Sequence, residues 1–264
     1  MKLSIAIPTL NSSEFIDDCI NSVRKINNVD EIIINDDGSN ELDYSILERK
    51  VEKLISSYNL NISLYRNEKN LGGFKNKYVT ISKCTNDYVY QIDSDNLAGL
   101  NTNKIFNDTF LSNLNSENFY LPSKVYVFKK NPYLSSLRKK YKVLIANKKF
   151  LLDKKEISRS MTDDEKLFVD VKNGWVFNLG NFIVNREYFL ERMKIGFESK
   201  DLPLAADPIA MCYFWLKEDG KLQLIENFYH FHRLRPNSYW YSAGEEATKS
   251  VEYFEKKIAN LNND

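Results

Sequence analysis

The stretch Tyr88-Val-Tyr-Gln-Ile-Asp-Ser-Asp-Asn96 is a short apolar run that stops at two aspartates separated by one serine. Its length and its aromatic and β-branched side chains predict a strand over residues 88–92. Toward the N-terminus, similar apolar runs lie at residues 3–7, 31–35 and 62–65. The segments between these runs carry apolar side chains at helical spacing, and we expect helices at about 15–26, 42–55 and 74–83.

This alternation of strands and helices predicts an α/β fold. Strands that are apolar on both faces and alternate with amphipathic helices form a parallel sheet covered on both sides. Ligands of such sheets bind beyond the carboxyl ends of the strands. Pro8-Thr9, Asp36-Asp37 and Asp93-Ser-Asp95 each follow a predicted strand, so we expect these polar segments to converge on one rim.

The second half of the chain is less regular. Its apolar patterns predict strands over 119–128, 176–184 and 222–232, and helices over 102–115, 186–193, 208–217 and 244–261. Residues 138–155 carry eight Lys or Arg against one Asp. A solvated face is the more common explanation for such a charge run, and contact with an anionic membrane surface or an anionic acceptor is the alternative.

Composition and charge exclude several classes of protein. Of 264 residues, 43% are hydrophobic, which is enough for a folded core, and no apolar run approaches the ~20 residues of a membrane span. The apolar part of residues 1–8 is too short for a signal peptide, so we expect a cytoplasmic protein. A net charge of +1 provides no general field for a polyanion, and nucleic acid is not an expected partner. Cys19, Cys84 and Cys212 lie far apart among apolar neighbours and are expected to be reduced core residues.

Asp93 and Asp95 have two interpretations. Two carboxylates in a short, turned stretch can share a divalent cation, which is what a metal-diphosphate site requires. They can also end a strand and make turn and cap hydrogen bonds, which is the more common role of an isolated D-x-D. The pattern is not an EF-hand loop, because the required glycine falls one position late at Gly99 and Lys104 stands where the bidentate glutamate belongs.

The acids after the second predicted strand, Asp36 and Asp37, also have a structural interpretation, in which an aspartate caps a helix and Gly38 adopts a positive φ. A dinucleotide-binding fold would place an acid here too, but it requires G-x-G-x-x-G after the first strand. The first loop, Pro8-Thr-Leu-Asn11, contains no glycine. We therefore do not expect a nicotinamide or flavin cofactor.

The two histidines and Asp207 are further candidates. His230 and His232 share one face of a predicted strand, and either imidazole can ligate a transition metal, although an isolated histidine is more often structural. Arg233 and Arg235 follow directly and supply cations suited to a phosphate. Asp207 precedes a proline and an apolar helical run, as an N-cap does. Because an N-cap aspartate can still act as a general base, both interpretations of Asp207 stand.

Four motifs in the first hundred residues resemble the family 2 glycosyltransferases in sequence, order and spacing. They are Ile5-Ala-Ile-Pro-Thr-Leu-Asn11, Ile34-Asn-Asp-Asp-Gly-Ser39, Asn70-Leu-Gly-Gly-Phe-Lys-Asn76 and Gln91-Ile-Asp-Ser-Asp-Asn96. The second half matches more loosely. Its matching segments are Leu179–Arg186, Ala206-Asp207, where the family usually has Glu-Asp, and Tyr229–His232 followed by Asn237-Ser238.

The resemblance implies the GT-A fold, with a Rossmann-like, mostly parallel central sheet, helices on both faces and an irregular acceptor-side half. In a single domain, residues 1–100 would be the nucleotide-sugar-binding half and 101–242 the acceptor-binding and catalytic half. Residues 243–264 would form a C-terminal helix.

The family's roles, carried onto matching positions, imply Mn²⁺ or Mg²⁺ and a nucleoside-diphosphate sugar. Asp95 would bind the metal directly, and Asp93 would lie at the ribose or the metal's water shell. His232 would be a further ligand, because the spacing of His232 to Asn237-Ser238 fits the family better than that of His230. Asp207 would be the general base. The residues implied at the donor are Pro8, Thr9, Asn11, Asp37, Gly72, Gly73, Lys75, Asn76, Asp93, Ser94, Arg233 and Arg235.

The implied activity is inverting transfer of a sugar to a hydroxyl of a glycan, a lipid-linked or a protein-linked acceptor, in glycan or polysaccharide synthesis. One alternative is a non-catalytic GT-A-like domain that binds sugar or nucleotide, but Asp95, Asp207 and both histidines are present. Another is a sugar-phosphate nucleotidyltransferase, which normally has a glycine-rich, basic loop after the first strand. The expected location is cytoplasmic, with peripheral contact at the inner membrane surface through 138–155 as the alternative. The sequence indicates no particular sugar, acceptor or oligomeric state.

Overall fold

The regular alternation of the first hundred residues produces the elements expected from it. The computed structural model describes residues 1–128, 142–145, 151–152, 180–235 and 238–261. The first elements are β1 (Leu3–Thr9), α1 (Ile16–Val23), β2 (Val29–Asp36), α2 (Glu41–Tyr58), β3 (Ile62–Arg66), α3 (Gly73–Ser82) and β4 (Tyr88–Gln91). The later ones are β5 (Leu97–Ala98), α4 (Thr102–Ile105), α5 (Asp108–Ser112), β6 (Asn118–Phe128), β7 (Lys142–Ile145), β8 (Leu151–Leu152), β9 (Phe182–Asn185), α7 (Arg186–Glu198), α8 (Asp207–Lys217), β10 (Lys221–Arg233) and α9 (Tyr239–Ala259).

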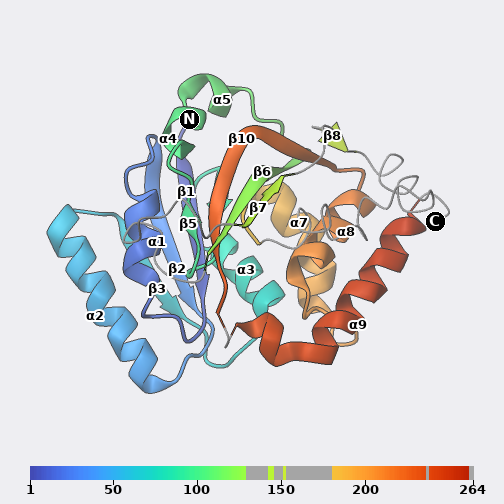
Figure 1. Cartoon of the computed structure of the whole chain (residues 1–264), viewed down its shortest axis with the longest axis horizontal. Helices are drawn as coiled ribbons and strands as arrows, with labels where there is room; N and C mark the ends of the chain where they lie inside the picture. Colours follow the sequence, from blue (N-terminus) through green and yellow to red (C-terminus); the bar gives the residue numbers. More distant parts are fainter. Residues whose placement is uncertain (129–141, 146–150, 153–179, 236–237, 262–264) are drawn as a thin grey trace.

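One sheet runs through both halves of the chain, in the order β3-β2-β1-β4-β9-β6-β10-β5 (Figure 1). The first four strands are parallel, as their two-sided apolar character predicts. β9 is antiparallel to both of its neighbours, β4 and β6, while β6 and β10 are parallel to each other. The α/β prediction is therefore confirmed, and the strand order departs from simple alternation where β9 enters between β4 and β6.

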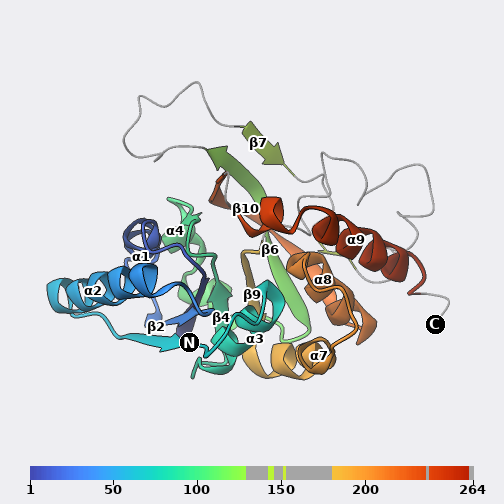
Figure 2. The same cartoon turned by 90° about the horizontal axis from the view of Figure 1, so that it is seen from below.

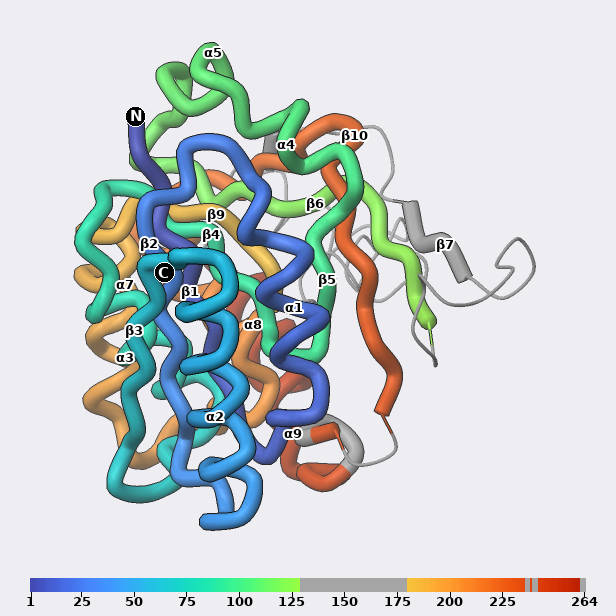
Figure 3. The backbone as a smooth tube through the Cα atoms, turned by 90° about the vertical axis from the view of Figure 1, so that its left-hand side faces the viewer, coloured from blue at the N-terminus to red at the C-terminus, as the bar shows by residue number. Residues whose placement is uncertain are grey.

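Helices cover both faces of this sheet (Figure 2). On β1, Leu3, Ile5 and Ile7 pack into the core formed with α1 and α2. Figure 3 shows these two helices in front of the sheet. Ala6, which points the other way, joins the core formed with α3, α7, α8 and α9. Every residue of β1 is buried because both faces are covered. The three cysteines are free and buried, as expected.

The predicted helix over 102–115 is instead two short helices, α4 and α5. Phe106 leaves the helical region, with φ −81° and ψ 50°. The side chain of Asn107 then caps α5 by accepting a hydrogen bond from the backbone N–H of Phe110 at 2.9 Å. A side chain that bonds nearby backbone groups competes with helix continuation, which explains the break.

The last helix also differs from its prediction, because α9 begins at Tyr239 and Gly244 produces a kink within it, with φ 46° and ψ −111°. Most of the basic stretch 138–155 and the start of the predicted strand 176–184 lie outside the described residues. Within the described part of the chain, no helix is both long and apolar enough to span a bilayer.

Candidate active site

The ends of three parallel strands meet at one rim of the sheet. Thr9 lies opposite Asp36 in the β1–β2 register, and its carbonyl accepts a hydrogen bond from the backbone N–H of Asp37 at 2.9 Å. On the other side of β1, the N–H of Ile92 donates to the carbonyl of Ala6 at 3.0 Å, which brings the following Asp93 to the same rim. The expected convergence of the first-loop, second-strand and D-x-D segments is present.

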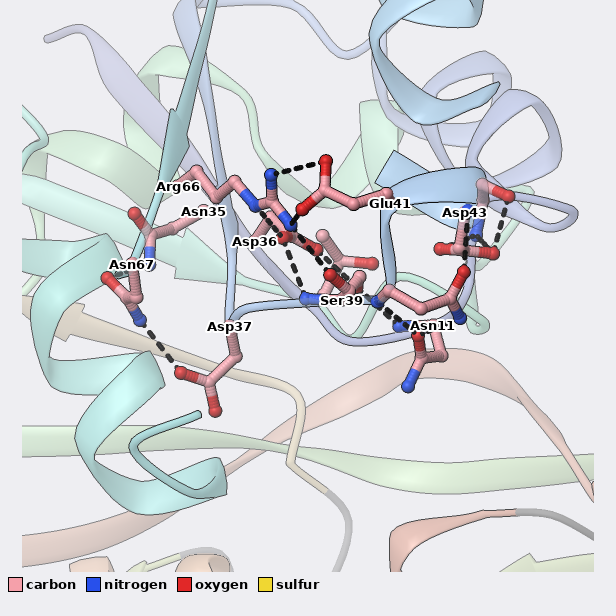
Figure 4. Close-up of polar contacts among 12 residues, drawn as sticks. Asn11, Asn35, Asp36, Asp37, Ser39, Glu41, Asp43, Arg66 and Asn67 are labelled. Carbon is pink, nitrogen blue, oxygen red and sulfur yellow. Dashed lines mark hydrogen bonds and ion pairs between the residues drawn. The ribbon is translucent and has the colours of Figure 1, made fainter. Parts of the chain in front are cut away.

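Asp37 holds the loop that leads into α3. Its Oδ1 accepts a hydrogen bond from the amide of Asn67 at 2.8 Å (Figure 4). The same oxygen accepts from the backbone N–H of Leu71 at 2.9 Å. Its Oδ2 accepts from the N–H of Gly72 at 3.0 Å. Burial raises the pKa of Asp37, and these donors partly oppose that shift. The carboxylate is thus fixed in orientation, with part of its acceptor capacity on Oδ2 remaining.

The neighbouring Asp36 has a structural role. It is fully buried and accepts a hydrogen bond from the N–H of Ser39 at 3.0 Å, while its Oδ2 lies 3.4 Å from Nε of Arg66 (Figure 4). Arg66 is held in turn by Glu41, at 2.7 Å.

Gly38 has the expected positive φ, but neither Asp36 nor Asp37 caps α2. The N-cap of α2 is Asn40, whose side chain accepts a hydrogen bond from the N–H of Asp43 at 3.0 Å. Asp36 binds the turn instead, and Asp37 binds the loop before α3.

Gly38 allows the turn after Asp36 and Asp37 to pack against that loop. Its φ is +74°, and a Cβ at this position would lie 2.9 Å from both the N of Asn70 and the carbonyl carbon of Lys69. We expect Gly38→Ala to lower the free energy of unfolding by roughly 2–4 kcal/mol, from backbone strain and steric overlap together. Urea unfolding measures this change.

Gly244→Ala is the matched control, because Gly244 has a φ of +46° but no atom within 4 Å of a Cβ. Gly244→Ala should lower the free energy of unfolding by the backbone-strain contribution alone, without steric overlap. Equal destabilisation of the two variants would contradict the close packing inferred at Gly38.

An amide network lies beneath Thr9 and Asp37. The amide of Asn35 donates to Asn76 at 2.6 Å and to Asn67 at 3.0 Å, and the amide of Asn76 donates to the carbonyl of Asn35 at 3.3 Å. Asn76 is therefore bound into the scaffold rather than directed outward. The hydroxyl of Thr9 is buried and has no hydrogen-bond partner among the described residues.

Lys77, which was not among the candidates from sequence, lies between the carboxylates of Asp93 and Asp207. Its Nζ is 3.1 Å from Oδ1 of Asp93 and forms an ion pair and hydrogen bond with Oδ2 of Asp207. Burial alone would lower the pKa of Lys77, but the charges of Asp207 and Asp93 outweigh it and raise the pKa above its usual value. The lysine is therefore a buried cation with two anionic partners from distant parts of the chain.

Asp207 does not cap its helix. It is the first residue of α8, the N-cap is Ala206, and no side-chain cap hydrogen bond is formed. The N-cap interpretation is wrong because the carboxylate binds Lys77 instead. Burial raises the pKa of Asp207, the charge of Lys77 opposes the shift, and the charge of Asp93 adds to it.

Two further contacts fix Asp93. Its Oδ1 also accepts a hydrogen bond from the amide of Gln91 at 2.9 Å, and its backbone N–H donates to Oδ1 of Asn181 at 3.0 Å. Gly180 has a φ of +59°, and a Cβ there would lie 2.3 Å from Oδ2 of Asp93. Gly180 and Asn181 lie in the segment Leu179–Arg186, whose sequence resembles the family. Their contact with the D-x-D turn is visible only in the folded structure.

The two arginines after the histidines have different surroundings. Arg233 is buried, and its guanidinium lies 3.1 Å from the carboxylate of Asp18 and donates to the carbonyl of Asp95 at 3.0 Å. The central carbon of the guanidinium is 4.5 Å from the ring centre of Phe15 and 4.7 Å from that of Phe128. Arg235 is less buried, and its Nε is 2.7 Å from Oδ2 of Asp95. Arg233 supports the D-x-D turn, and Arg235 faces its carboxylate.

We expect Arg233→Ala to lower the free energy of unfolding by about 3 kcal/mol, because it removes a cation whose side chain is only 7% exposed and leaves its partners without it. Arg235→Ala removes a cation whose side chain is 19% exposed, so it should cost less. Chemical denaturation of both variants gives the comparison. Greater destabilisation by Arg235→Ala would reverse these assignments.

His232 is the histidine that faces the aspartates. Burial lowers the pKa of His232, and the charges of Asp95 and Asp93 partly oppose the shift. Burial also lowers the pKa of His230, and the only other contribution to that shift is the charge of His232, whose ring centre is 6.2 Å away. Nδ1 of His232 is buried and has no hydrogen-bond partner among the described residues, and the same is true of both ring nitrogens of His230.

These donors fit a divalent cation in type. Asp95 offers carboxylate oxygen and His232 offers an unpaired imidazole nitrogen, both of which Mn²⁺ accepts. In the described residues, no group of three His, Cys, Asp or Glu side chains is close enough to hold a metal. A bound diphosphate or water would have to complete the coordination.

The remaining predicted donor contacts lie at varied places. Lys75 donates to the carbonyl of Ser199 at 2.8 Å, and Asn11 has a φ of +45° and accepts from the amide of Asn40 at 2.8 Å. Pro8 and Ser94 are buried, and the N–H of Gly72 binds Asp37. Lys75 and Asn11 therefore bind other parts of the protein in this structure.

Residues 4–99 match the model of "Glycosyl transferase family 2". This match covers about a third of the chain. The matched segment contains Thr9, Asp37, Lys77, Asp93 and Asp95, so most of the rim described above lies within it.

Two curated relatives each match 40% of the chain or less. The uncharacterized glycosyltransferase MG060 of Mycoplasma genitalium is 34% identical over 110 residues, which are 40% of this chain and 36% of that protein. The abequosyltransferase RfbV of Salmonella typhimurium is 32% identical over 98 residues, 36% of this chain and 28% of that protein. The match spans about a third of the length of each relative.

Solved structures extend the similarity of fold to the second half. S. aureus TarS 1–349 in complex with UDP-GlcNAc has a TM-score of 0.60 at 17% identity, over 98% of this chain and 67% of that one. GalNAc-T7 with UDP, GalNAc and Mn²⁺ has a TM-score of 0.60 at 18% identity, over 89% of this chain and 43% of that one. The mannosyltransferase PcManGT of Pyrobaculum calidifontis, with GDP-Man and Mn²⁺, has a TM-score of 0.58 at 13% identity, over 98% of this chain and 69% of that one. The segment that matches the family model is therefore part of a GT-A fold that continues through Asp207 and His232.

Proposed function

We propose that this chain is an inverting glycosyltransferase that moves a sugar from a nucleoside-diphosphate sugar to an acceptor hydroxyl. The observation that carries the proposal is the bridge from Asp93 through Lys77 to Asp207 within a GT-A fold. It places the D-x-D turn, where a diphosphate would bind, beside a buried carboxylate from the second half. Similar proteins bound to UDP-GlcNAc and to GDP-Man support a donor of this chemical class.

The donor would lie across the rim. Thr9, Asp37 and the loop at Gly72 would contact the nucleoside, since Asp37 holds that loop and keeps acceptor capacity on Oδ2. Arg235 would bind the diphosphate, because its guanidinium lies beside Asp95, where the metal and the diphosphate would meet. Arg233 would act indirectly, by fixing the D-x-D turn.

Asp95 and His232 would hold Mn²⁺ or Mg²⁺, with Asp93 beside them. A divalent cation supplies electrostatic stabilisation of the charge that develops on a departing diphosphate. Arg235 would add positive charge at the same place.

Asp207 would be the general base. As the acceptor oxygen bonds to the anomeric carbon, the bond from that carbon to the diphosphate breaks, and the hydroxyl proton moves to the carboxylate of Asp207. Attack from the face opposite the diphosphate inverts the anomeric centre. Residues 1–100 would bind the donor, 101–242 would bind the acceptor and contribute Asp207, and 243–264 would form a supporting C-terminal helix.

A thermal-shift screen tests this function. We expect one class of nucleotide sugar, from a panel that includes UDP-GlcNAc and GDP-mannose, to stabilise the protein in the presence of MnCl₂. At a concentration 100 times the Kd, binding to the folded state adds about 2.7 kcal/mol. Failure of every nucleotide sugar and nucleoside diphosphate to bind would overturn the proposal, and binding without turnover would favour a non-catalytic binding domain.

Asp95→Ala is expected to remove the manganese-dependent part of that stabilisation, since it deletes the proposed oxygen ligand. The shift in melting temperature with MnCl₂, minus the shift without it, measures the effect. Asp201→Ala, at an exposed aspartate, is the matched control and should behave as wild type. A full manganese-dependent shift in Asp95→Ala would rule out Asp95 as the metal ligand.

A further inference from the structure

The two carboxylate oxygens of Asp207 have different neighbours. Oδ2 binds the ammonium group of Lys77. Oδ1 lies on the side of Gly73, where an added Cβ would be 3.2 Å from it. One oxygen is therefore engaged by a cation, and the other borders a position that has no side chain.

Gly73 and Lys77 come from the same face of one helix. They are four residues apart in α3, so their side-chain positions lie one turn from each other and both reach Asp207. Lys77 is constrained on other sides as well, because its Nζ also pairs with Asp93 and would lie 2.9 Å from a Cβ at Gly180. With a side chain only 7% exposed, the lysine has little freedom to move away from Oδ2.

The backbone does not require glycine at position 73. Gly72, with φ +87°, needs the left-handed region, whereas Gly73 is absent from the positive-φ glycines and begins a regular helix. Alanine would favour that helix by up to ~1 kcal/mol. The three atoms nearest to a Cβ at residue 73 all belong to the carboxylate of Asp207. What glycine provides here is space beside Asp207.

We propose that Lys77 is a positioning residue that holds Oδ2 of Asp207, so that Oδ1 is the oxygen that receives the acceptor proton. Gly73 keeps the approach to Oδ1 open for the acceptor hydroxyl. This inference rests on the proposed function of Asp207 as the base. The hydroxyl proton goes to Oδ1 while its oxygen bonds to the anomeric carbon and the bonding electrons of the sugar–phosphate bond leave with the diphosphate.

The test uses the nucleotide sugar that stabilises the protein most in the thermal-shift screen, with free mono- and disaccharides as acceptors. Release of nucleoside diphosphate gives kcat and the donor KM. We expect Gly73→Ala to lower kcat by about 10²-fold, because it displaces the acceptor oxygen from Oδ1. The donor KM should stay within about twofold. Because a Cβ at residue 73 would lie 3.2 Å from Oδ1 of Asp207, the carboxylate must shift slightly, so a small fall in melting temperature is expected and kcat is measured well below that temperature.

Lys77 variants provide a second, independent measurement. Lys77→Arg keeps the cation and should retain more of kcat than Lys77→Met, at a similar donor KM. If Lys77 were needed only for folding, the two variants would have the same kcat once the rate is divided by the concentration of folded enzyme. Lys83→Met, at an exposed lysine at the end of the same helix, is the matched control and should leave kcat unchanged.

The outcomes separate this inference from the proposed function. Wild-type kcat in Gly73→Ala, together with an inactive Asp207→Asn, would overturn the inference and leave the function standing. Full activity of Asp207→Asn would overturn the base assignment and the inference with it. Absence of turnover by wild type with every donor that binds would overturn the proposed transferase activity.

Discussion

Asp207→Asn is expected to lower kcat for glycosyl transfer by about 10²–10⁴-fold, the usual contribution of a positioned general base. The amide has nearly the shape of the carboxylate and can still accept a hydrogen bond from Lys77, but it cannot take the acceptor proton. Lys77 also keeps its partner Asp93, at 3.1 Å. Initial rates of nucleoside diphosphate release measure the loss.

Donor binding should survive this substitution, because Asp37, Asp95 and Arg235 are unchanged. Calorimetric titration with the nucleotide sugar from the screen should give a Kd within a few-fold of wild type. Asp201→Asn, at an exposed site, is the matched control for loss of one carboxylate. An Asp207→Asn variant that binds donor but retains wild-type kcat would place the base elsewhere.

Lys77→Met should lower the free energy of unfolding by about 3–5 kcal/mol, the range for removing one partner of a buried ion pair. The side chain of Lys77 is 7% exposed and that of Asp207 is 13% exposed, so little solvent remains to stabilise the abandoned carboxylates. Urea unfolding at pH 8 measures the loss. Lys83→Met is the control, and a loss below about 1 kcal/mol in Lys77→Met would show that the buried pair is not stabilising.

The pH dependence of this loss has a definite sign. Burial and the charge of Asp93 raise the pKa of Asp207, and Lys77 opposes them. Removing Lys77 raises that pKa further, so the folded variant binds protons more readily than the unfolded chain. The destabilisation should therefore shrink as the pH falls through the raised pKa. Repeating the urea measurement at pH 5 checks this, and a larger loss at pH 5 than at pH 8 would contradict it.

The parts of this fold that depend on local pattern were predictable from sequence. β1 to β4 and α1 to α3 follow from apolar periodicity, and the rim follows from the rule that parallel strands share a carboxyl end. Lys77 was not predictable in this way, since a lysine in an amphipathic helix usually faces solvent. Its partner Asp207 is 130 residues away, and no local pattern encodes that contact.

Residues with similar local patterns also proved to have different surroundings. Asp36 and Asp37 are adjacent, yet one binds a turn and Arg66 while the other binds the loop before α3. Arg233 and Arg235 both lie over the ring of Phe15, but Arg233 is more buried and pairs with Asp18, whereas Arg235 pairs with the carboxylate of Asp95. Asp207 had the sequence context of an N-cap, but a long-range ion pair replaced the local hydrogen bond.

The position of β9 between β4 and β6 bears on attempts to redesign the protein by exchanging segments. β9 pairs with β4 from Tyr88 opposite Asn185 to Gln91 opposite Phe182, and Asn181 accepts a hydrogen bond from the N–H of Asp93. A chimera with a foreign C-terminal portion would therefore replace a strand and a contact that shape the D-x-D turn. A chimera that retained residues 180–185 and 232–235 from the original chain would keep β9, the Asn181 contact and the arginine contacts that hold the D-x-D turn.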